Sequence, residues 1–482
     1  MDKKMICGYE AYPLSVQTVS GQALCMVSTP QGDQLLAQGS GLGFAGQAFE
    51  YEGARCTLAP LSHENALRLR QLLPFTAPRA GLNGTCSIGV GDRLGIATPG
   101  HLRVFKRWPK VFPILAQQSI RELNLTGRTY EEVLDSATFA VFREGYTTGW
   151  GADGDHLKKP EEIRCALDCG FSMITLDCSE YIRNDVQDMS GEEAGRAYEP
   201  DRLLESLYLE QVFTLKDGTA LRFGRAELIR AVLIYGKALQ FMQEMYERFL
   251  KGKALDFEIS IDETLTPTSP LQHFFVASEL TRAGVRFQSL APRFCGEFQK
   301  GIDYIGDLAQ FNAELDLHAA IAGHFGYKLS VHSGSDKFSV FPAVGRATHG
   351  VFHLKTAGTN WLEAVRLVAM KDPALYRRVL AFALNSFKAA SAYYHVNSRP
   401  ENIPDLKTLR NAELPGLMDH NDARQVLHIT YGLILTARAP DGSRLFKDAL
   451  YALWAAHQEE YAQLLDGHIG RHVELLFSQV ET

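Results

Sequence analysis

Two histidines stand where short apolar runs of the sequence give way to polar residues. His156 follows Asp155 in GWGADGDHLKKPEEI, and His332 lies in YKLSVHSGSDK. Neutral imidazole binds Zn²⁺, Mn²⁺, Fe²⁺, Co²⁺ and Ni²⁺ alike. We therefore predict that both histidines bind a divalent metal cation whose identity the sequence does not fix. His353 comes earlier in its apolar run, so it is the second choice as a metal ligand. Its alternative role is that of a side chain in the interior of the fold.

An oxygen donor from another part of the chain should complete such a site. The segment APRFCGEFQKGIDY offers Glu297 and Gln299, which are two residues apart and share one face if the segment is extended. The chemistry of the two groups favours the carboxylate of Glu297, and a family pattern described below favours Gln299.

The segment FEISIDET ends in carboxylates that are suited to proton transfer. Alternation places Asp262 and Thr264 on one face and Glu263 on the other, behind apolar residues. Desolvation there would raise the pKa of Glu263 and make it a general acid. Asp155 is the natural opposing base, with its pKa lowered by a nearby metal. An ordinary helix N-cap is the alternative role for Asp262.

Eight short β-like runs, separated by helical patterns, must position these groups. This alternation is typical of βα units and a parallel sheet. Eight such strands predict a closed (β/α)₈ barrel, an α/β fold of the TIM type. The runs are TCSIGVGDRLG (85–95), VFPILAQQS (111–119), TTGWGADGDHL (147–157), FSMITLDCSE (171–180), LDFEISIDET (255–264), VRFQSLAPRF (285–294), YKLSVHSG (327–334) and VFHLKTAGTN (351–360).

The remaining parts of the chain surround or interrupt this barrel. Residues 1–80 contain short alternating stretches such as QALCMVST and predict a small β-rich N-terminal unit. Residues 81–370 are the predicted catalytic barrel, with a helical insertion at about 181–254 between the fourth and fifth strands. Residues 371–482 are almost wholly helical in pattern and predict a C-terminal helical extension.

Helical patterns between the runs support the barrel. TYEEVLDSATFAVFREG and PLQHFFVASELTRAG both place apolar residues at helical spacing and end on a glycine suited to a C-cap. PEEI, at 160–163, predicts the start of a further helix directly after His156 and its neighbours.

Polar residues gather at the downstream ends of the eight runs, whereas the upstream halves are apolar. Active sites of such barrels form at the C-terminal ends of the strands, and a purely structural barrel has no need of this asymmetry. Cationic, amide and hydroxyl groups at these ends predict a small anionic, hydroxyl-rich substrate. The predicted substrate-binding residues are Gln118, Ser119, Lys158, Lys300, Ser333 and Lys337.

Composition excludes several other classes of protein. A formal charge of −7 and a pI near 6.1 argue against general nucleic-acid binding, which needs a basic surface. No signal-peptide pattern and no run of about 18 apolar residues is present, so we expect a cytoplasmic protein without membrane contact. The eight cysteines show no CxxC spacing and are expected to be reduced, buried thiols. The sequence allows a homo-oligomer without specifying one.

The sequence resembles the tagaturonate epimerase family, bacterial enzymes that interconvert tagaturonate and fructuronate. The likeness covers almost the whole predicted barrel in order, while residues 1–80 and the C-terminal helical region add little to it. The stretches that carry it are GVGDRLGIATPGH (89–101), AQQSIREL (116–123), GWGADGDHLKKPEEI (149–163), FEISIDET (257–264), LAPRFCGEFQKGIDYIGDL (290–308), YKLSVHSGSDKFSVFP (327–342) and LKTAGTN (354–360).

This resemblance implies a metal-dependent epimerase that acts on a sugar acid in hexuronate catabolism. By it, Asp155 is similar to the family's proton acceptor and Glu263 to its proton donor. The residues similar to the divalent-metal ligands are His156, Gln299 and His332. An amide at the position of Gln299 would bind a metal less strongly than a carboxylate.

The expected reaction constrains the mechanism. Tagaturonate and fructuronate differ at a hydroxyl-bearing carbon β to the ketone, where no adjacent carbonyl activates the C–H bond. A β-hydroxyketone can instead be opened by retro-aldol cleavage and closed again after the aldehyde fragment has rotated. The alternatives are a metal-dependent aldolase or isomerase of another ketose or ketose phosphate, and a non-catalytic regulator that binds sugar acids.

Overall fold

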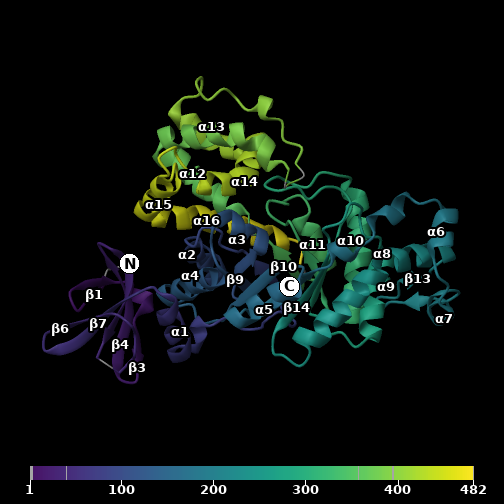
Figure 1. The fold of residues 1–482 in the computed structure, drawn as a ribbon, viewed down its shortest axis with the longest axis horizontal. Coiled ribbons are helices and arrows are strands. Elements are labelled where there is room, and N and C mark those ends of the chain that lie inside the picture. Colours follow the sequence, from purple (N-terminus) through teal and green to yellow (C-terminus); the bar gives the residue numbers. More distant parts are fainter. Residues whose placement is uncertain (1–3, 40, 357, 393, 395, 481–482) are drawn as a thin grey trace.

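The computed structural model describes residues 4–39, 41–356, 358–392, 394 and 396–480. A seven-stranded antiparallel sheet comes first in the chain and lies at the lower left of Figure 1. Its strand order is β1-β2-β4-β5-β7-β6, with β3 paired to β4. The strands are β1 Lys4–Ile6, β2 Tyr9–Ala11, β3 Gln17–Val19, β4 Gln22–Thr29, β5 Gly32–Gln38, β6 Gln47–Tyr51 and β7 Ala54–Pro60.

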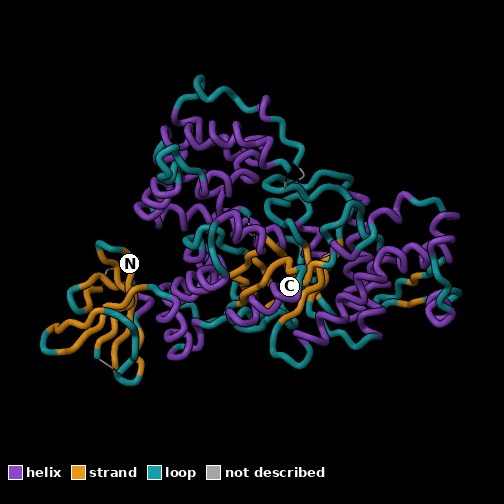
Figure 2. The backbone as a smooth tube through the Cα atoms, viewed as in Figure 1, coloured by secondary structure: helices purple, strands orange, loops and turns teal. Residues whose placement is uncertain are grey.

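Parallel strands then close into a barrel in the order β10-β11-β14-β15-β16-β17-β8-β9, which Figure 2 shows as the central group of orange strands. Each of the eight predicted runs contains one of these strands, so the predicted α/β barrel is confirmed. The strands are β8 Ser87–Gly89, β9 Phe112–Ser119, β10 Gly151–Leu157, β11 Met173–Asp177, β14 Asp256–Ile261, β15 Ser289–Pro292, β16 Lys328–Val331 and β17 Phe352–Lys355.

Helices follow most of the barrel strands, and several of them begin at a side-chain cap. In α4 and α9 the Thr129 and Ser269 hydroxyls accept hydrogen bonds from the backbone three residues on, in complete capping boxes. The helix α5 begins at Pro160, as predicted. The helices of this region are α1 His63–Leu72, α2 Thr98–Arg107, α3 Ile120–Thr126, α4 Tyr130–Arg143, α5 Pro160–Cys169, α9 Pro270–Arg282, α10 Leu308–Phe325, α11 Phe341–Ala347 and α12 Thr359–Lys371.

The insertion between β11 and β14 projects from one side of the barrel, at the right of Figure 1. It packs through the long helix α8, Arg225–Met245, which continues into a π-helical turn at Tyr246–Leu250. This matches the strong helix predicted for its second half. The other elements are α6 Gly191–Ala197, α7 Arg202–Tyr208, β12 Phe213–Thr214 and β13 Ala220–Leu221.

The last part of the chain is helical and lies above the barrel in Figure 1. The helix α16 packs against α2 and α11 of the barrel, and the buried indoles of Trp361 and Trp454 meet at 6.2 Å between ring centroids. This arrangement places residues from the C-terminal helices beside the barrel mouth. The helices are α13 Pro373–Ala390, α14 Asn421–Thr436, α15 Lys447–Ala456 and α16 Gln458–Phe477.

The cysteines of the described chain form no disulfide. Five of the eight are buried as expected, whereas Cys165 is exposed and Cys7 and Cys169 are half-buried. Among the described residues, no helix has the length and apolar character that crossing a membrane requires. The cytoplasmic location stays a prediction.

Candidate active site and metal centre

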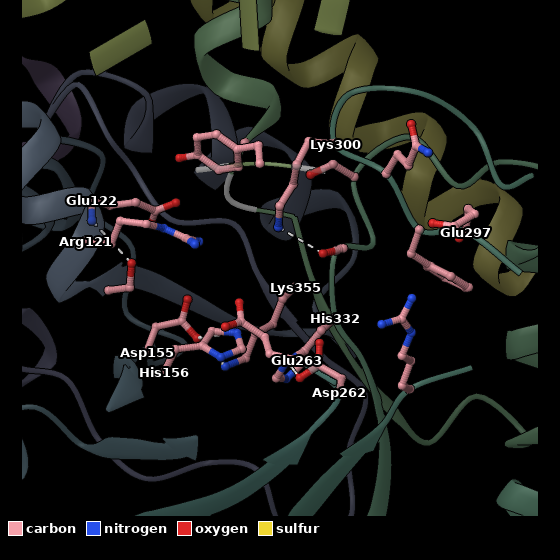
Figure 3. Close-up of a pocket in the computed structure, with 18 of the residues that line it drawn as sticks. Arg121, Glu122, Asp155, His156, Asp262, Glu263, Glu297, Lys300, His332 and Lys355 are labelled. Atoms are coloured by element: carbon pink, nitrogen blue, oxygen red, sulfur yellow. Dashed lines mark hydrogen bonds and ion pairs between the residues drawn. The ribbon is translucent and has the colours of Figure 1, made fainter. Parts of the chain in front are cut away.

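A cavity of about 290 Å³ opens at the C-terminal ends of the barrel strands. Polar and charged side chains from several strand ends converge on it, and Figure 3 shows them pointing inward from opposite walls. Tyr394 and His428, from the C-terminal helical region, also line it. The cavity therefore lies where the sequence predicted an active site.

The end of β10 presents two neighbouring side chains to this cavity. Adjacent residues of a regular strand point to opposite faces, so Asp155 and His156 need an irregularity to share one site. His156 has a φ of 52°, in the left-handed region, and the pairing of β10 with β11 shifts register between Gly154 and Leu157. Such strain in a non-glycine residue costs about 1–3 kcal/mol and concentrates at functional sites.

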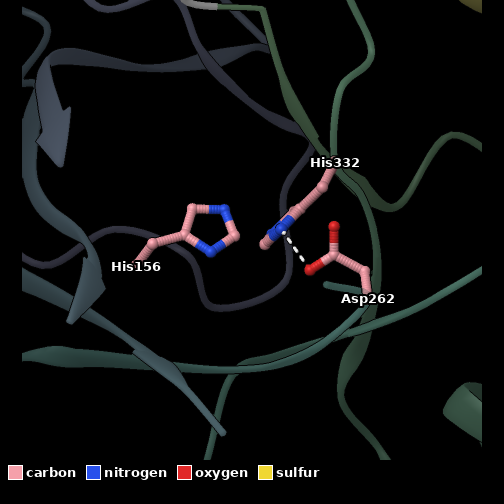
Figure 4. Close-up of side chains that lie close together, drawn as sticks. All are labelled: His156, Asp262 and His332. Atoms are coloured by element: carbon pink, nitrogen blue, oxygen red, sulfur yellow. Dashed lines mark hydrogen bonds and ion pairs between the residues drawn. The ribbon is translucent and has the colours of Figure 1, made fainter. Parts of the chain in front are cut away.

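His156, Asp262 and His332 form a compact group (Figure 4), and all three line the cavity. One ligand atom from each of the three lies within 4.8 Å of the others, and the two imidazole rings have centroids 4.9 Å apart. The structure thus brings the two predicted histidine ligands together. It adds Asp262, for which the sequence had suggested only a helix cap.

Each of these histidines is held by a carboxylate behind it. The His156 Nδ1 lies 3.2 Å from Asp177 Oδ2, which leaves Nε2 toward the cavity. The His332 Nε2 lies 2.7 Å from Glu258 Oε1, which leaves Nδ1 at 3.0 Å from Asp262 Oδ1. A carboxylate on the far ring nitrogen is the usual support of a metal-binding histidine because it fixes the tautomer and orientation. The donor set therefore fits a divalent metal ion.

The charged side chains around this group shift one another's pKa values. Burial alone would lower the pKa of His156, but Asp155 and then Glu263 raise it to about 10. Burial would raise the pKa of Asp155, but the ammonium of Lys355 and then His156 hold it below its usual range. Asp155 is therefore ionised, as expected for a base. The sequence had attributed this shift to a metal, and Lys355 supplies it here.

Lys355 ties several strands together beneath the cavity. Its Nζ lies 2.6 Å from Asp155 Oδ1, 2.8 Å from Asp153 Oδ2 and 2.8 Å from Glu258 Oε1. Burial would lower the pKa of Lys355, but these carboxylates raise it well above its usual value. The sequence alone does not single out Lys355, because it cannot show that three acids surround this lysine.

Glu263 lies at the mouth of the cavity rather than deep inside. Its side chain is 35% exposed, and its Oε2 lies 3.7 Å from Lys158 Nζ. The desolvated setting that the sequence predicted for Glu263 is therefore absent, because the residue follows the end of β14 on a surface loop. Lys158 also donates to Ser179 Oγ at 3.0 Å and lies 3.4 Å from Asp177.

Comparison with known proteins identifies the family. The family described as UxaE, tagaturonate epimerase, matches residues 12–476. A tagaturonate/fructuronate epimerase from Thermotoga maritima is 42% identical over 480 residues, which cover 97% of each chain. The chain belongs to the tagaturonate epimerase family. It is thus a member of a family of isomerases.

Solved structures agree with this assignment. The native crystal structure of a fructuronate-tagaturonate epimerase from Cohnella laeviribosi is 53% identical, with a TM-score of 0.94, and covers 97% of this chain and 96% of its own. A complex of that enzyme with one glycerol gives the same values. The similarity extends over the barrel and over both flanking regions.

Gln299, the metal ligand suggested by the family resemblance, lies at the cavity wall but is already engaged. Its Oε1 accepts hydrogen bonds from the Asn397 backbone N–H at 2.9 Å and from Gln425 Nε2 at 3.0 Å. Both lone pairs of the oxygen are thereby used, so metal binding would require one hydrogen bond to break. Glu297, the alternative, also lines the cavity.

Lys337 does not reach the cavity, although the sequence suggested that it binds substrate. Its fully buried Nζ donates to the backbone carbonyls of Gln299 at 2.8 Å, Ile302 at 2.6 Å and Ser335 at 2.9 Å. Burial lowers the pKa of Lys337 to about 7. The residue joins the loops after β15 and β16, because backbone carbonyls of these loops accept hydrogen bonds from its buried ammonium group.

The other predicted substrate-binding residues divide between wall and interior. Lys300, Ser333 and Ser119 line the cavity, and Lys300 Nζ donates to Ser333 Oγ at 2.9 Å. Gln118 is fully buried and does not line the cavity, whereas its neighbour Gln117 does and donates to Asp155 Oδ2 at 3.3 Å. Alternation along β9 decides between the two glutamines.

His353 lies inside the barrel, as the sequence allowed. It is fully buried, and its Nδ1 lies 2.9 Å from Ser87 Oγ. Burial lowers the pKa of His353 to about 3, so its ring is neutral. It belongs to the packed interior below the site.

Proposed function

We propose that this protein is a metal-dependent epimerase that interconverts tagaturonate and fructuronate. One observation carries the metal requirement: two cavity-facing histidines, each backed by a carboxylate, converge with Asp262 in a chain of this family. The names of its relatives from Thermotoga maritima and Cohnella laeviribosi support the substrates.

We assign the metal to His156, His332 and Asp262. The carboxylate of Asp262 shares the group with both imidazoles, whereas the amide oxygen of Gln299 already accepts two hydrogen bonds. When bound, a divalent ion supplies electrophilic stabilisation of negative charge that develops on a substrate oxygen. Zn²⁺, Mn²⁺, Fe²⁺, Co²⁺ and Ni²⁺ all suit two imidazoles and a carboxylate.

The protein's own residues move the protons. Asp155 is ionised beside Lys355 and accepts the proton of the substrate hydroxyl β to the ketone. Loss of that proton lets the alkoxide become an aldehyde: the bond to the carbon beside the ketone breaks, its electron pair stays on the ketone fragment as an enediolate, and the aldehyde can rotate. The enediolate then re-forms the bond on the other face of the aldehyde, and Glu263, in its protonated form, gives its proton to the new alkoxide. Proton exchange with solvent at the cavity mouth, where Glu263 is 35% exposed, returns both carboxyl groups to their starting states.

Lys355 has a supporting role in these steps. Its ammonium group keeps Asp155 oriented and charged before the reaction, because it also contacts Asp153 and Glu258 on neighbouring strands. The cavity walls retain the aldehyde fragment between cleavage and re-addition, so that the protein releases a diastereomer rather than fragments.

Purified protein tests this proposal directly. It should convert tagaturonate to fructuronate, lose activity on chelation, and regain it when a divalent metal ion is added. Solvent deuterium should stay out of the epimerised carbon, because no step removes its C–H proton. Incorporation of deuterium there would contradict the retro-aldol route, and full activity after exhaustive chelation would contradict the metal site.

A further inference from the structure

The cavity is charged differently at its two ends. Asp155, Asp262 and Glu263 gather around the histidines, whereas Arg121 and Lys300 lie at the opposite end. Figure 3 shows the side chains of Arg121 and Lys300 directed toward the same part of the cavity, away from Asp262 and His332. A negatively charged substrate group is repelled by the first end and attracted by the second.

Arg121 is oriented but not neutralised. Its guanidinium group lies 5.1 Å from the centre of the Tyr394 ring, and no carboxylate of the described residues lies within ion-pair distance of it. When a guanidinium stacks on an aromatic ring, its N–H donors point outward in the plane of the guanidinium. They stay free to bind a carboxylate in that plane. Tyr394 thereby holds Arg121 ready for an anion.

The nearest acid is occupied by a different arginine. Glu122 pairs with the buried guanidinium of Arg93, which also lies 4.6 Å from the centre of the Tyr431 ring. Glu122 forms its ion pair with Arg93 and acts on Arg121 only over a longer distance. Two donors of Arg93, Nε and Nη1, are buried without a hydrogen-bond partner in the part of the chain that the structure describes. This end of the cavity keeps an excess of positive charge.

Lys300 faces the same space from the loop after β15. Its Nζ donates one hydrogen bond to Ser333 Oγ at 2.9 Å. Ser333 has a φ of 50°, so the strained turn after β16 places its hydroxyl beside the lysine. A carboxylate between Lys300 and Arg121 would receive charge-assisted hydrogen bonds from both sides.

We propose that Arg121 and Lys300, with Ser333, form the subsite that binds the substrate carboxylate and so orients the ketone toward His156 and His332. The inference rests on the proposed function and deepens it, since it assigns the acid end of the substrate to one end of the cavity. Tyr394 brings the C-terminal region into this subsite, which makes that region part of substrate selection.

Steady-state kinetics of Arg121→Gln and Lys300→Met test the subsite. For either variant, the KM for tagaturonate should rise about 10- to 100-fold while kcat changes little, because a charged hydrogen bond is lost in ground state and transition state alike. Arg121→Lys should recover part of the loss. Arg248→Gln, on the exposed end of the insertion, is the matched control and should keep the wild-type KM. A KM within twofold of wild type in both cavity variants would overturn the assignment.

A sugar acid that cannot be epimerised tests carboxylate binding at this subsite independently of the reaction. D-galactonate should raise the melting temperature of the wild-type protein, and galactitol, its neutral counterpart, should not. The rise should disappear in Arg121→Gln and Lys300→Met. No rise in the wild type, or an equal rise in the variants, would overturn the subsite. A wild-type protein that binds galactonate but does not epimerise tagaturonate would instead refute the proposed function alone.

Discussion

In the described part of the chain, histidines and carboxylates gather at two different places, and the two places differ in their suitability for a metal. The first consists of His156, Asp262 and His332 at the cavity. The second consists of Asp336, His468 and His472, where the loop after β16 meets α16. Both groups have the residue types and the proximity that metal binding requires.

Hydrogen bonding distinguishes the two groups. In the second, His472 Nδ1 lies 2.9 Å from the His468 carbonyl oxygen, and its Nε2 accepts the Asp336 backbone N–H at 3.1 Å. Both ring nitrogens of His472 are thus used within the protein. In the first group, His156 keeps Nε2 toward the cavity, and His332 Nδ1 faces Asp262 Oδ1 at 3.0 Å, a carboxylate that itself belongs to the candidate ligand set.

Charge distinguishes them as well. The Arg424 guanidinium contacts Asp336 Oδ2 at 2.6 Å, and His468 Nε2 lies 2.6 Å from Asp336 Oδ1. These cations already balance the only acid in the second group. The comparison teaches that proximity of ligand types is not sufficient: a metal site also needs free nitrogen lone pairs and uncompensated negative charge. The second group instead fastens α14 and α16 to the loop that follows His332.

The largest expected effect is the loss of a metal ligand. His332→Ala should remove the bound metal and lower kcat/KM about 10³-fold or more, because the electrophile and its orientation are lost together. Metal analysis of the purified protein and epimerase assays measure this. His472→Gln is the matched control from the second group and should keep the wild-type metal content per folded chain. Loss of metal in His472→Gln would show that the second group also binds a metal.

The acid at the cavity mouth comes next. Glu263→Gln should lower kcat about 10²- to 10⁴-fold, since one proton-transfer group is removed, and should leave the metal content unchanged. Rates and metal content are measured on the same preparation. Wild-type turnover in this variant would exclude Glu263 as the proton donor.

Breaking the second group should affect stability rather than chemistry. Arg424→Met leaves the buried carboxylate of Asp336 without its guanidinium and should lower the free energy of unfolding by about 3–5 kcal/mol. Chemical denaturation measures the change. Arg346→Met, which loses a pair with Asp316 in which both side chains are exposed, should cost less and serves as the comparison. A fall in metal content of folded Arg424→Met would show that the second group does bind metal.

The two candidates for the third ligand can be separated by metal affinity. Asp262→Asn should weaken metal binding about 10- to 100-fold, whereas Gln299→Met should leave it within a few-fold of wild type. Competition with a chelator measures both affinities. The reverse order would assign the metal to Gln299, as the family resemblance suggests.

The smallest expected effect is a pH dependence from the second group. Burial would lower the pKa of His468, but Asp336 and then Glu363 raise it above its usual 6.5. The folded protein therefore binds a proton that the unfolded chain loses, and this stabilisation is complete below pH 6.5 and declines as the pH rises through the folded-state pKa. The slope is at most about 1.4 kcal/mol per pH unit. The difference in unfolding free energy between wild type and His468→Gln should shrink above pH 6.5, and a constant difference would refute this.

Much of the site was predictable because barrel strands carry their chemistry at one end. The polar endings after apolar runs placed Asp155, His156, Glu263 and His332 at a common mouth, and the structure puts all four on one cavity. Which glutamine of β9 lines the cavity was harder to predict. Gln117 and Gln118 are adjacent and chemically identical, and only the register of the closed barrel decides which of them faces the substrate.

The sequence by itself determined the order of strands and helices, the end of the barrel that carries the chemistry, and the two histidines, since these follow from local polarity and periodicity. Tertiary structure alone decided that a register shift turns Asp155 and His156 to one side, that Asp262 joins the histidines, and that Lys337 is a brace between loops. These outcomes depend on distances between groups far apart in the chain. No local pattern encodes which donor finds which acceptor when the barrel closes.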